Sequence, residues 1–216
     1  MDERPEIAVR PAKGPLHGRI ALPRSKSVAN RALVCAALAG DLSQVRDLSD
    51  AADTVLLRDL LKERHQAMHC GLGGTTLRFA LAWAAVQEGE ERLVTGESAL
   101  LARPHHGLVH ALCQLGAVID TTASGFMVKG RRLRGGQLVL DSPPSSQFLS
   151  ALMLVAPGFE QGLELRWTGR RLSRPYVHMT AAVMRHFGAS VDLAEDVIRV
   201  CPDAYRASAF TVPPDW

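Results

Sequence analysis

The sequence predicts an α/β (α+β) fold made of three copies of one βαβαββ unit. Three observations lead to this prediction: small-residue loops that each open an apolar helix, a second helix after each, and hairpin-like stretches after two of those second helices. With 47% hydrophobic and 22% charged residues, the chain has enough apolar side chains for a buried core.

Each predicted unit begins with a loop and an apolar helix. The three stretches are PRSKSVANRALVCAALAG from residue 23, CGLGGTTLRFALAWAAVQEG from residue 70 and SPPSSQFLSALMLVAPG from residue 142. Serine or glycine stands where a helix N-terminus leaves backbone N–H groups without partners. Because nearly every face of these helices is apolar, we expect all three to be buried.

A second helix follows in each unit. The candidates are DAADTVLLRDLLKER from residue 50, RPHHGLVHALCQLGA from residue 103 and SRPYVHMTAAVMRHFGA from residue 173. Pro104 and Pro175 suit the first turn of a helix. Gly116 and Gly188 suit the residue after a helix end, where a left-handed backbone is common.

Two hairpins are expected after the second and third of these helices. The stretches AVIDTTASGFMVKG from residue 117 and ASVDLAEDVIRVCP from residue 189 alternate apolar and polar residues around a turn. The first unit has no room for such a hairpin before Gly71. The closing stretch, FTVPPDW from residue 210, reads as an extended strand without a partner.

Composition excludes several classes of function. The net charge is only +3 and the arginines are dispersed, so we expect no nucleic-acid binding. No apolar run is long enough for a membrane span, and the N-terminus lacks the apolar core of a secretory signal. A cytoplasmic, reducing compartment is the default. Cys35 and Cys113 lie in apolar helical patterns and are expected in the core, reduced.

Metal chemistry is not favoured by the sequence. The four cysteines are far apart and form no CxxC pair, so structural zinc and a disulfide framework are not expected. His106 and His110 stand four residues apart, but no acidic or cysteine ligand is placed nearby. A solvated helix face is the better interpretation of this pair.

The predicted repeat has a chemical consequence. If three units pack with pseudo-threefold symmetry, their loops converge and their helix N-termini point at one region. Free N–H groups and the helix dipoles make that region attractive to phosphate or carboxylate. Hydroxyl donors and cations in these loops would strengthen it; they are Ser25, Ser27, Ser145, Ser146, Ser173, Lys26, Arg31 and Arg103. A serine nucleophile with a lysine base is disfavoured because no third catalytic partner or nucleophile elbow is present.

Five ordered motifs resemble the enolpyruvyl transferase family, and within it the 5-enolpyruvylshikimate-3-phosphate synthases. The motifs are LPRSKSVANRALVCAALA, GLGGTTLRF, LLARPHHGLVHALCQLGA, SSQFLSALMLVAP and SRPYVHMTAAVMRHFGA. The family fold has two similar domains of three βαβαββ units each. The resemblance implies that residues 21–213 form one such domain. It also implies that residues 1–20 belong to the partner domain and that residues 214–216 begin the return hinge.

The resemblance also implies a reaction. The family transfers the enolpyruvyl group of phosphoenolpyruvate to shikimate 3-phosphate and releases phosphate, without metal or cofactor. Carried over by motif, the residues expected to bind shikimate 3-phosphate are Lys26, Ser27, Arg31, Ser145, Ser146, Gln147, Ser173 and Tyr176. Those expected to bind phosphoenolpyruvate are Lys26, Gly74, Arg103 and Gln147. Lys26 would lie between the substrates and is the catalytic candidate.

The chain departs from the family pattern at four positions. The family usually has Asn at Leu72, often Ala at Gly73, Pro at Phe79 and Gly at Arg24. The loss of an amide at Leu72 removes a polar group near the phosphoenolpyruvate loop.

The family's proton-transfer carboxylates lie in the domain that this chain lacks. We therefore expect the isolated chain to be inactive and, like the family, monomeric. Its own acidic residues cluster outside the motifs, with Asp50 and Asp53 at a helix start. Two alternatives stay open. One is a UDP-N-acetylglucosamine enolpyruvyl transferase, which would carry a reactive cysteine before the Arg103–Pro104 helix. The other is a non-catalytic anion-binding module.

Overall fold

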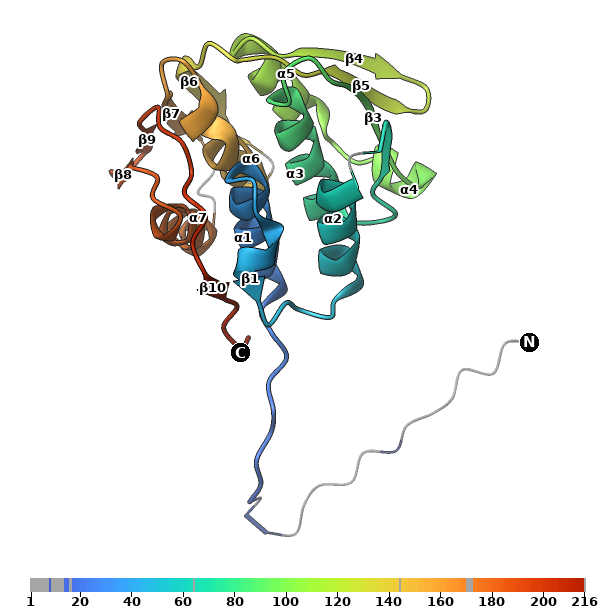
Figure 1. The fold of residues 1–216 in the computed structure, drawn as a ribbon, viewed down its shortest axis with the longest axis vertical. Helices are drawn as coiled ribbons and strands as arrows, with labels where there is room; N and C mark the ends of the chain where they lie inside the picture. Colours follow the sequence, from blue (N-terminus) through green and yellow to red (C-terminus); the bar gives the residue numbers. More distant parts are fainter. Residues whose placement is uncertain are drawn as a thin grey trace, which may run out of the picture.

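Three buried helices form the centre of the molecule in the computed structural model, which describes residues 8, 14–15, 17–63, 65–143, 145–169 and 173–215. These are α1 (Lys26–Leu38), α3 (Gly74–Ala85) and α6 (Ser146–Val155). Each contacts the other two (Figure 1). Their sequences are apolar on nearly every face because they are enclosed on all sides, as predicted.

Three outer helices surround this centre. They are α2 (Ala52–Glu63), α5 (His106–Gln114) and α7 (Arg174–His186). Each packs into a groove between two central helices: α2 against α1 and α3, α5 against α3 and α6, and α7 against α6 and α1. This cyclic arrangement is the pseudo-threefold symmetry that the sequence predicts.

Two four-stranded sheets cover the helices and share one topology. The first has the order β2 (Ala67–His69), β3 (Glu91–Thr95), β5 (Gly125–Lys129), β4 (Val118–Thr122). The second has the order β6 (Gly136–Asp141), β7 (Leu163–Thr168), β9 (Val197–Val200), β8 (Val191–Leu193). In each sheet the first pair is parallel and the other two pairs are antiparallel. Two complete βαβαββ units and both predicted hairpins are thus confirmed.

The first unit is incomplete, as predicted. After α1 come a single 3-10 turn (Leu42–Gln44) and β1 (Val45–Arg46), and α2 leads to β2 without a hairpin. The prediction that the closing strand has no partner is wrong. This strand, β10 (Phe210–Thr211), pairs in parallel with β1. The missing hairpin leaves β1 with a free edge, which the closing strand occupies.

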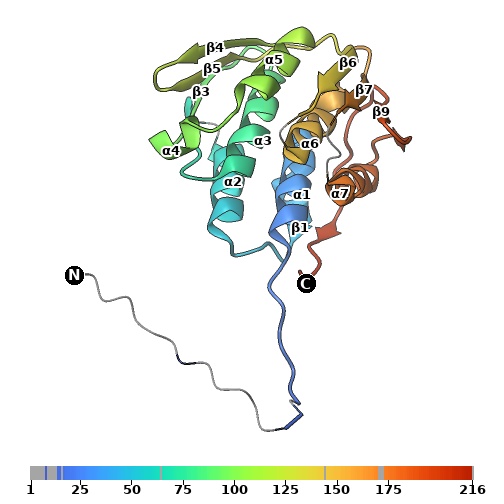
Figure 2. The ribbon, with the colours of Figure 1, turned by 180° about the vertical axis from the view of Figure 1, so that it is seen from behind.

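Two short elements complete the structure, α4 (Ser98–Leu101) and a 3-10 turn at Ala156–Gly158. The segments that enter and leave the folded part lie side by side (Figure 2). Ser25 N–H donates to Pro213 O (2.9 Å), and Asp215 N–H donates to Pro23 O (2.8 Å). Backbone bonds therefore join the start of α1 to the segment that follows β10.

Of the two prolines and two glycines that were predicted to mark helix ends, three stand where the sequence places them. Pro175 lies in the first turn of α7, and Gly116 (φ 108°) and Gly188 (φ 91°) follow α5 and α7 in the left-handed region. Pro104 is different, because α5 begins two residues later, at His106. The Arg-Pro pair therefore forms a corner between α4 and α5.

The cysteines are all free thiols. The prediction that two of them are buried in the core is right for one and wrong for the other. Cys35 is buried in α1, as expected. Cys113 is exposed, because its helix turns one face to solvent while Leu108 and Leu112 pack inward. None of the helices in the described part of the chain is long and apolar enough to cross a membrane.

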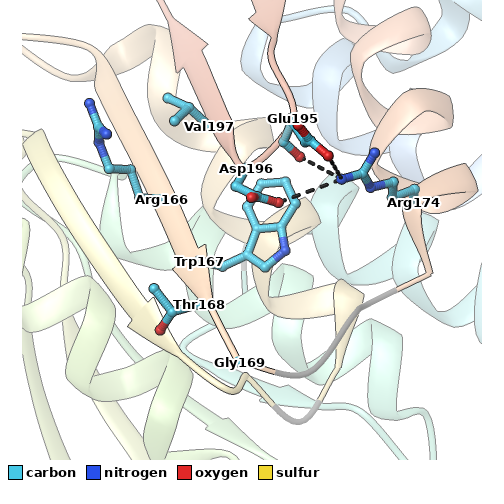
Figure 3. Close-up of a pocket in the computed structure, with 8 residues that line it drawn as sticks. All are labelled: Arg166, Trp167, Thr168, Gly169, Arg174, Glu195, Asp196 and Val197. Carbon is cyan, nitrogen blue, oxygen red and sulfur yellow. Dashed lines mark hydrogen bonds and ion pairs between the residues drawn. The ribbon is translucent and has the colours of Figure 1, made fainter.

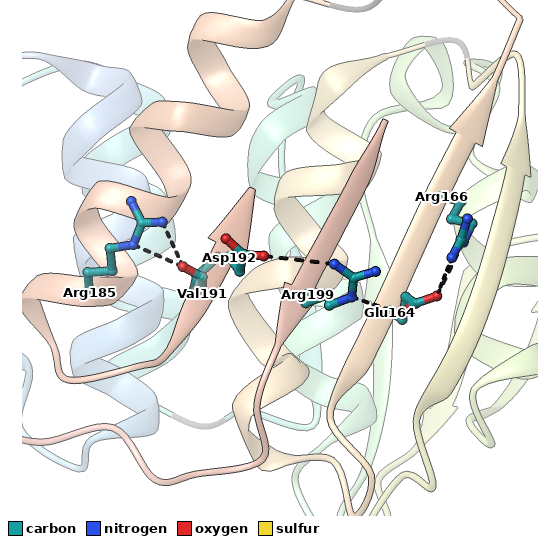
Figure 4. A network of polar contacts seen from close by, with 6 residues as sticks. All are labelled: Glu164, Arg166, Arg185, Val191, Asp192 and Arg199. Carbon is teal, nitrogen blue, oxygen red and sulfur yellow. Dashed lines mark hydrogen bonds and ion pairs between the residues drawn. The ribbon is translucent and has the colours of Figure 1, made fainter. Parts of the chain in front are cut away.

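The outer face of the second sheet carries a ladder of charges (Figure 4). Glu164 on β7 accepts from Arg166 (2.9 Å) and from Arg199 on β9 (2.9 Å). Those two hydrogen bonds lower the pKa of the Glu164 carboxyl. Leu165 and Trp167 alternate with these residues and are buried on the other face. The alternation shows that one face is solvated and the other covers the helices.

We predict that Gly130→Ala destabilises the fold through the contact between the first complete sheet and α3. A Cβ at Gly130 would lie 1.9 Å from the Gln87 carbonyl oxygen, which the backbone cannot easily move. Overpacking of this kind costs about 1–3 kcal/mol. Urea unfolding would measure the loss. The matched control is Gly158→Ala, because a Cβ there meets nothing within 4 Å. Equal stability of the two variants would contradict the close approach.

Candidate functional site

The described chain has a cavity of about 370 Å³ where the helix N-termini converge. A volume of this size lies within the usual range for small-molecule sites. The first turns of α1, α3, α6 and α7 contribute to its wall. Its lining residues are Lys26, Ser27, Asn30, Arg31, Thr75, Ser145, Ser146, Gln147 and Tyr176. Seven residues predicted from the sequence as substrate ligands are thus brought together around one space.

Backbone N–H groups are available at this cavity. Neither Ser25 before α1 nor Gly73 before α3 makes a side-chain capping bond. Ser145 does cap its own helix, accepting from Gln147 N–H (3.2 Å). As an acceptor in that bond, the Ser145 hydroxyl keeps its own proton for another partner. Several helix N-termini with free donors make the cavity attractive to an anion.

Arg31 lies at the base of the cavity and is only 2% exposed. Its Nε donates to Thr180 Oγ1 (2.7 Å) and its Nη2 to Ser150 Oγ (2.9 Å). Its Nη1 donates to the Ser27 carbonyl oxygen (2.7 Å). Burial lowers the pKa of Arg31 to about 10, partly offset by Tyr176. The guanidinium stays charged at neutral pH and keeps two of its five N–H groups for a ligand.

The hydroxyls around Arg31 form one satisfied network. Thr180 donates its single hydroxyl proton to the Tyr176 carbonyl oxygen (2.7 Å). The contact between Ser150 Oγ and Thr180 Oγ1 (2.9 Å) therefore has Ser150 as its donor. The Arg31 guanidinium carbon lies over the Tyr176 ring, 5.6 Å from the centroid of the ring. The network thus links the buried cation to an aromatic side chain on the cavity wall.

Lys26 has an acidic neighbour that the sequence did not lead us to expect. Its Nζ lies 3.2 Å from Asp53 Oδ2, and Asp53 comes from the first turn of α2. A Cβ on Gly73 would lie 3.1 Å from Asp53 Oδ1, so glycine leaves room for the carboxylate. The prediction that the acidic residues cluster away from the motifs is therefore wrong for Asp53. The contact joins parts of the chain that are 27 residues apart, so spacing alone did not reveal it.

Arg78 is the main site residue that sequence reasoning missed. It lies on α3, donates to Gln147 Oε1, and stacks over the Phe148 ring at 5.4 Å. Its Nε is buried without a partner among the described residues. Burial lowers the pKa of Arg78, and the nearby charge of Arg103 lowers it further. The motif GLGGTTLRF contained this arginine, and its place one turn into a buried helix was the signal.

Arg78 and Arg103 meet above the first residue of α3. A Cβ on Gly74 would lie 3.2 Å from a terminal nitrogen of each guanidinium. In the part of the chain that the structure describes, neither arginine has a carboxylate within ion-pair distance. Two guanidinium groups without a counter-charge repel each other unless an anion lies between them. Gly74 and Arg103, predicted together, are therefore placed together, next to Thr75, which lines the cavity.

Ser173, unlike Gly74 and Arg103, has no contact with other predicted ligands among the contacts described above. It precedes α7, is exposed, and does not line the cavity. The exposed His106 and His110 lie on the outward face of α5, as the solvated-face interpretation predicts.

The family departures have structural explanations in three cases. Phe79 is buried and its ring lies 5.5 Å from the Arg31 guanidinium carbon, so it packs against the buried cation. Arg24 pairs with Asp47 (2.6 Å) and thereby ties the entry segment to the end of β1. Leu72 is 59% exposed, so its side chain points away from the core.

A second cavity, of about 470 Å³, lies between β7, the start of α7 and the β8–β9 turn (Figure 3). Although larger, it contains none of the predicted ligands. Both of its arginines already have acidic partners: Arg174 lies 3.5 Å from Asp196 and 4.0 Å from Glu195, and Arg166 lies 2.9 Å from Glu164. The cavity at the helix N-termini has the chemistry that the larger one lacks.

Comparison with known proteins agrees with the geometry. The family model for EPSP synthase (3-phosphoshikimate 1-carboxyvinyltransferase) matches residues 11–64 and 58–216. The chain belongs to the EPSP synthase family. A 3-phosphoshikimate 1-carboxyvinyltransferase of Bacteroides fragilis is 37% identical over 210 residues, which cover 95% of this chain and 51% of that protein. One from Korarchaeum cryptofilum is 32% identical over 236 residues, covering 97% and 55%.

The chain spans about half the length of these EPSP synthase relatives. The solved EPSP synthase of Acinetobacter baumannii has the same fold, with a TM-score of 0.78 over 92% of this chain and 50% of that one. Its sequence identity is only 20%, so this similarity is evidence for the fold alone. The fold of this chain therefore corresponds to about half of an EPSP synthase.

We predict that Thr180→Val lowers stability by about 1–3 kcal/mol, because the Nε–H of Arg31 and the Ser150 hydroxyl would be buried without an acceptor. Chemical denaturation would measure the change. Thr121→Val on the exposed strand β4 is the matched control, and a surface change of this kind stays within about 0.5 kcal/mol. A loss no greater than that of the control would show that the buried network does not hold the fold.

Proposed function

We propose that this chain supplies a large part of the site for transfer of an enolpyruvyl group from phosphoenolpyruvate to shikimate 3-phosphate. The observation that supports this proposal most is a cavity that brings four helix N-termini together with Lys26 and Arg31, while Arg78 and Arg103 lie beside Gly74, the neighbour of the lining residue Thr75. Both substrates are anions, and this cavity has more cations than carboxylates. Membership of the EPSP synthase family supports the same conclusion.

One side of the cavity suits shikimate 3-phosphate. Ser145 and Ser146 open α6 with free hydroxyl donors, and a phosphate there would also meet the N–H groups of the helix. Ser27 and Arg31 approach from α1, and Tyr176 offers a ring face to the carbocycle. The remaining predicted ligands on this side are Lys26, Gln147 and Ser173, the last of which the substrate would meet only outside the cavity.

The other side suits phosphoenolpyruvate. Gly74 offers its backbone N–H at the start of α3, and Arg103 and Arg78 add charge beside it. Gln147 lies between the two sides because it accepts from Arg78 while its helix begins with the serines. A planar guanidinium can bind a carboxylate or phosphate through two parallel hydrogen bonds.

Lys26 is the proposed catalytic residue. It lies on the cavity wall between the two sides, and its pairing with Asp53 orients the ammonium group. The reaction needs a proton delivered to the methylene carbon of phosphoenolpyruvate and another removed from the attacking hydroxyl. Asp53 already accepts from Lys26, so further carboxylates for these steps would come from the other half of the enzyme, which would close over the site. We propose that the two halves act together as a monomer in the cytoplasm.

The alternatives are less well supported. A UDP-N-acetylglucosamine enolpyruvyl transferase would carry a cysteine in the loop before Arg103, and none is present there. The relatives named above also carry the shikimate name. A non-catalytic anion-binding module would use the same cavity. An activity assay of the complete protein distinguishes it from an enzyme, because only the enzyme would release phosphate.

We predict that Ser145→Ala/Ser146→Ala weakens shikimate 3-phosphate binding to the 216-residue chain more than tenfold. Each lost hydrogen bond to a charged group is worth about 1.5–3 kcal/mol. Isothermal titration calorimetry would measure the affinity, and circular dichroism would check folding because Ser145 also caps α6. Ser98→Ala/Ser190→Ala, two exposed serines outside the cavity, is the matched control. Unchanged affinity in the cavity variant would remove the serines from the site.

We predict that Arg103→Gln weakens phosphoenolpyruvate binding about tenfold and changes shikimate 3-phosphate binding less than twofold. The reason is that Arg103 lies beside Gly74, while the serines lie across the cavity. Arg58→Gln, on the exposed face of α2, is the matched control. An equal loss for both ligands would contradict the division of the cavity into two sides.

A further inference from the structure

Arg103 stands on a corner between two helices rather than within one. The turn α4 ends at Leu101, α5 begins at His106, and Pro104 lies between them. In a continuing helix the Leu100 carbonyl would accept from the N–H of residue 104, four positions later. Proline has no N–H, so that bond cannot form. The Arg103 backbone N–H donates to this carbonyl instead, which leaves its second lone pair available to a further donor.

His105 supplies that second donor. Its Nε2 lies 2.8 Å from the Leu100 carbonyl oxygen, which also accepts from the Arg103 backbone N–H (3.0 Å). A carbonyl can only accept, so Nε2 must carry the proton. Arg103 and His105, on either side of Pro104, therefore both donate to the Leu100 carbonyl oxygen.

The ring of His105 is enclosed and neutral. It is 0% exposed and packs edge-on against Phe126 of β5, with centroids 6.0 Å apart. Its Nδ1 is buried without a partner among the described residues, so a second proton there would find no acceptor. The charged and titratable groups around it are Arg78 from α3, Arg103 from the corner and His106 from α5. Burial lowers the pKa of His105, the hydrogen bond to Leu100 partly offsets this, and these three groups lower it further.

We propose that His105 is a positioning residue for Arg103, holding the α4–α5 corner so that the guanidinium stays beside Gly74. The role rests on the proposed function in that Arg103 serves phosphoenolpyruvate. Arg103 is exposed and faces Arg78, so like charges push it away from the cavity when no anion is bound. A fixed backbone corner opposes that displacement. The family resemblance assigned no role to His105.

The test compares His105→Leu with His105→Gln in the 216-residue chain. Leucine removes the donor, whereas the glutamine side-chain amide can again donate to the Leu100 carbonyl. One hydrogen bond of this kind corresponds to about a three- to tenfold change in an equilibrium. We expect the Arg103 amide to exchange with solvent faster by this factor in His105→Leu, and phosphoenolpyruvate affinity to fall by a similar factor. Shikimate 3-phosphate affinity should change less than twofold, and His105→Gln should restore both properties.

A second readout examines the imidazole directly. In ¹⁵N-labelled parent protein, nitrogen chemical shifts should show His105 protonated at Nε2 only, and still neutral when the pH falls below the ordinary histidine value of 6.5. The matched control is His110→Leu, the same substitution at an exposed position of α5, which should leave Arg103 exchange unchanged.

The outcomes separate the two proposals. Failure of the parent chain to bind phosphoenolpyruvate, with faster Arg103 exchange in His105→Leu, would overturn the function of the site and support the positioning role. Unchanged Arg103 exchange in His105→Leu, or a proton on Nδ1, would overturn the positioning role. Equal affinity losses for both ligands, without rescue by glutamine, would show that His105 only stabilises the fold.

Discussion

The buried guanidinium of Arg31 is the interaction on which the rest of the structure depends. It comes from α1 and binds Ser150 on α6 and Thr180 on α7, so one side chain joins three helices. A buried charge is costly unless all its neighbours are in place. The fold therefore positions α6 and α7 against α1 with hydroxyls aimed inward. The same arrangement puts the first turns of these helices around one cavity, so the cost of burying the cation and the geometry of the site have a common cause.

Helix N-termini then concentrate positive partial charge on the cavity, and the arginines at its edge add to it. Arg78 and Arg103 lie close together without a carboxylate between them in the described chain, which disfavours the empty site. An anion between the two guanidinium groups would relieve this repulsion. The fold therefore contributes part of the free energy of anion binding, because it holds these groups in place beforehand. Gln147 accepts from Arg78 and also stands at the start of α6. It is the contact through which occupancy of one side of the cavity would be felt on the other.

Much of this could be predicted from the sequence, and the failures have physical reasons. Periodicity and loop composition predicted the central helices, the hairpins and the converging loops, because these depend on local pattern. Asp53 beside Lys26 and β10 beside β1 were not foreseen, because both contacts join segments that are distant in the chain. Arg78 was missed although its place one turn into a buried helix was a signal, because its contact with Gln147 joins two helices that are distant in the chain. Ser173 was predicted by motif but lies outside the cavity. A motif can therefore name a substrate-binding residue without fixing where its side chain lies.

The corner at Arg103 shows how a local defect can become part of a site. Proline interrupts the hydrogen bonding of α4 and frees the Arg103 side chain from a helical direction. The interruption removes one donor from the Leu100 carbonyl, which still accepts from the Arg103 backbone N–H and has a second lone pair available. A histidine next to the proline donates to that carbonyl, and burial lowers the pKa of its imidazole, with the charges of Arg78 and Arg103 lowering it further. The Leu100 carbonyl thus fixes the proton on Nε2, and the charges that would attract an anion oppose a second proton on the same ring.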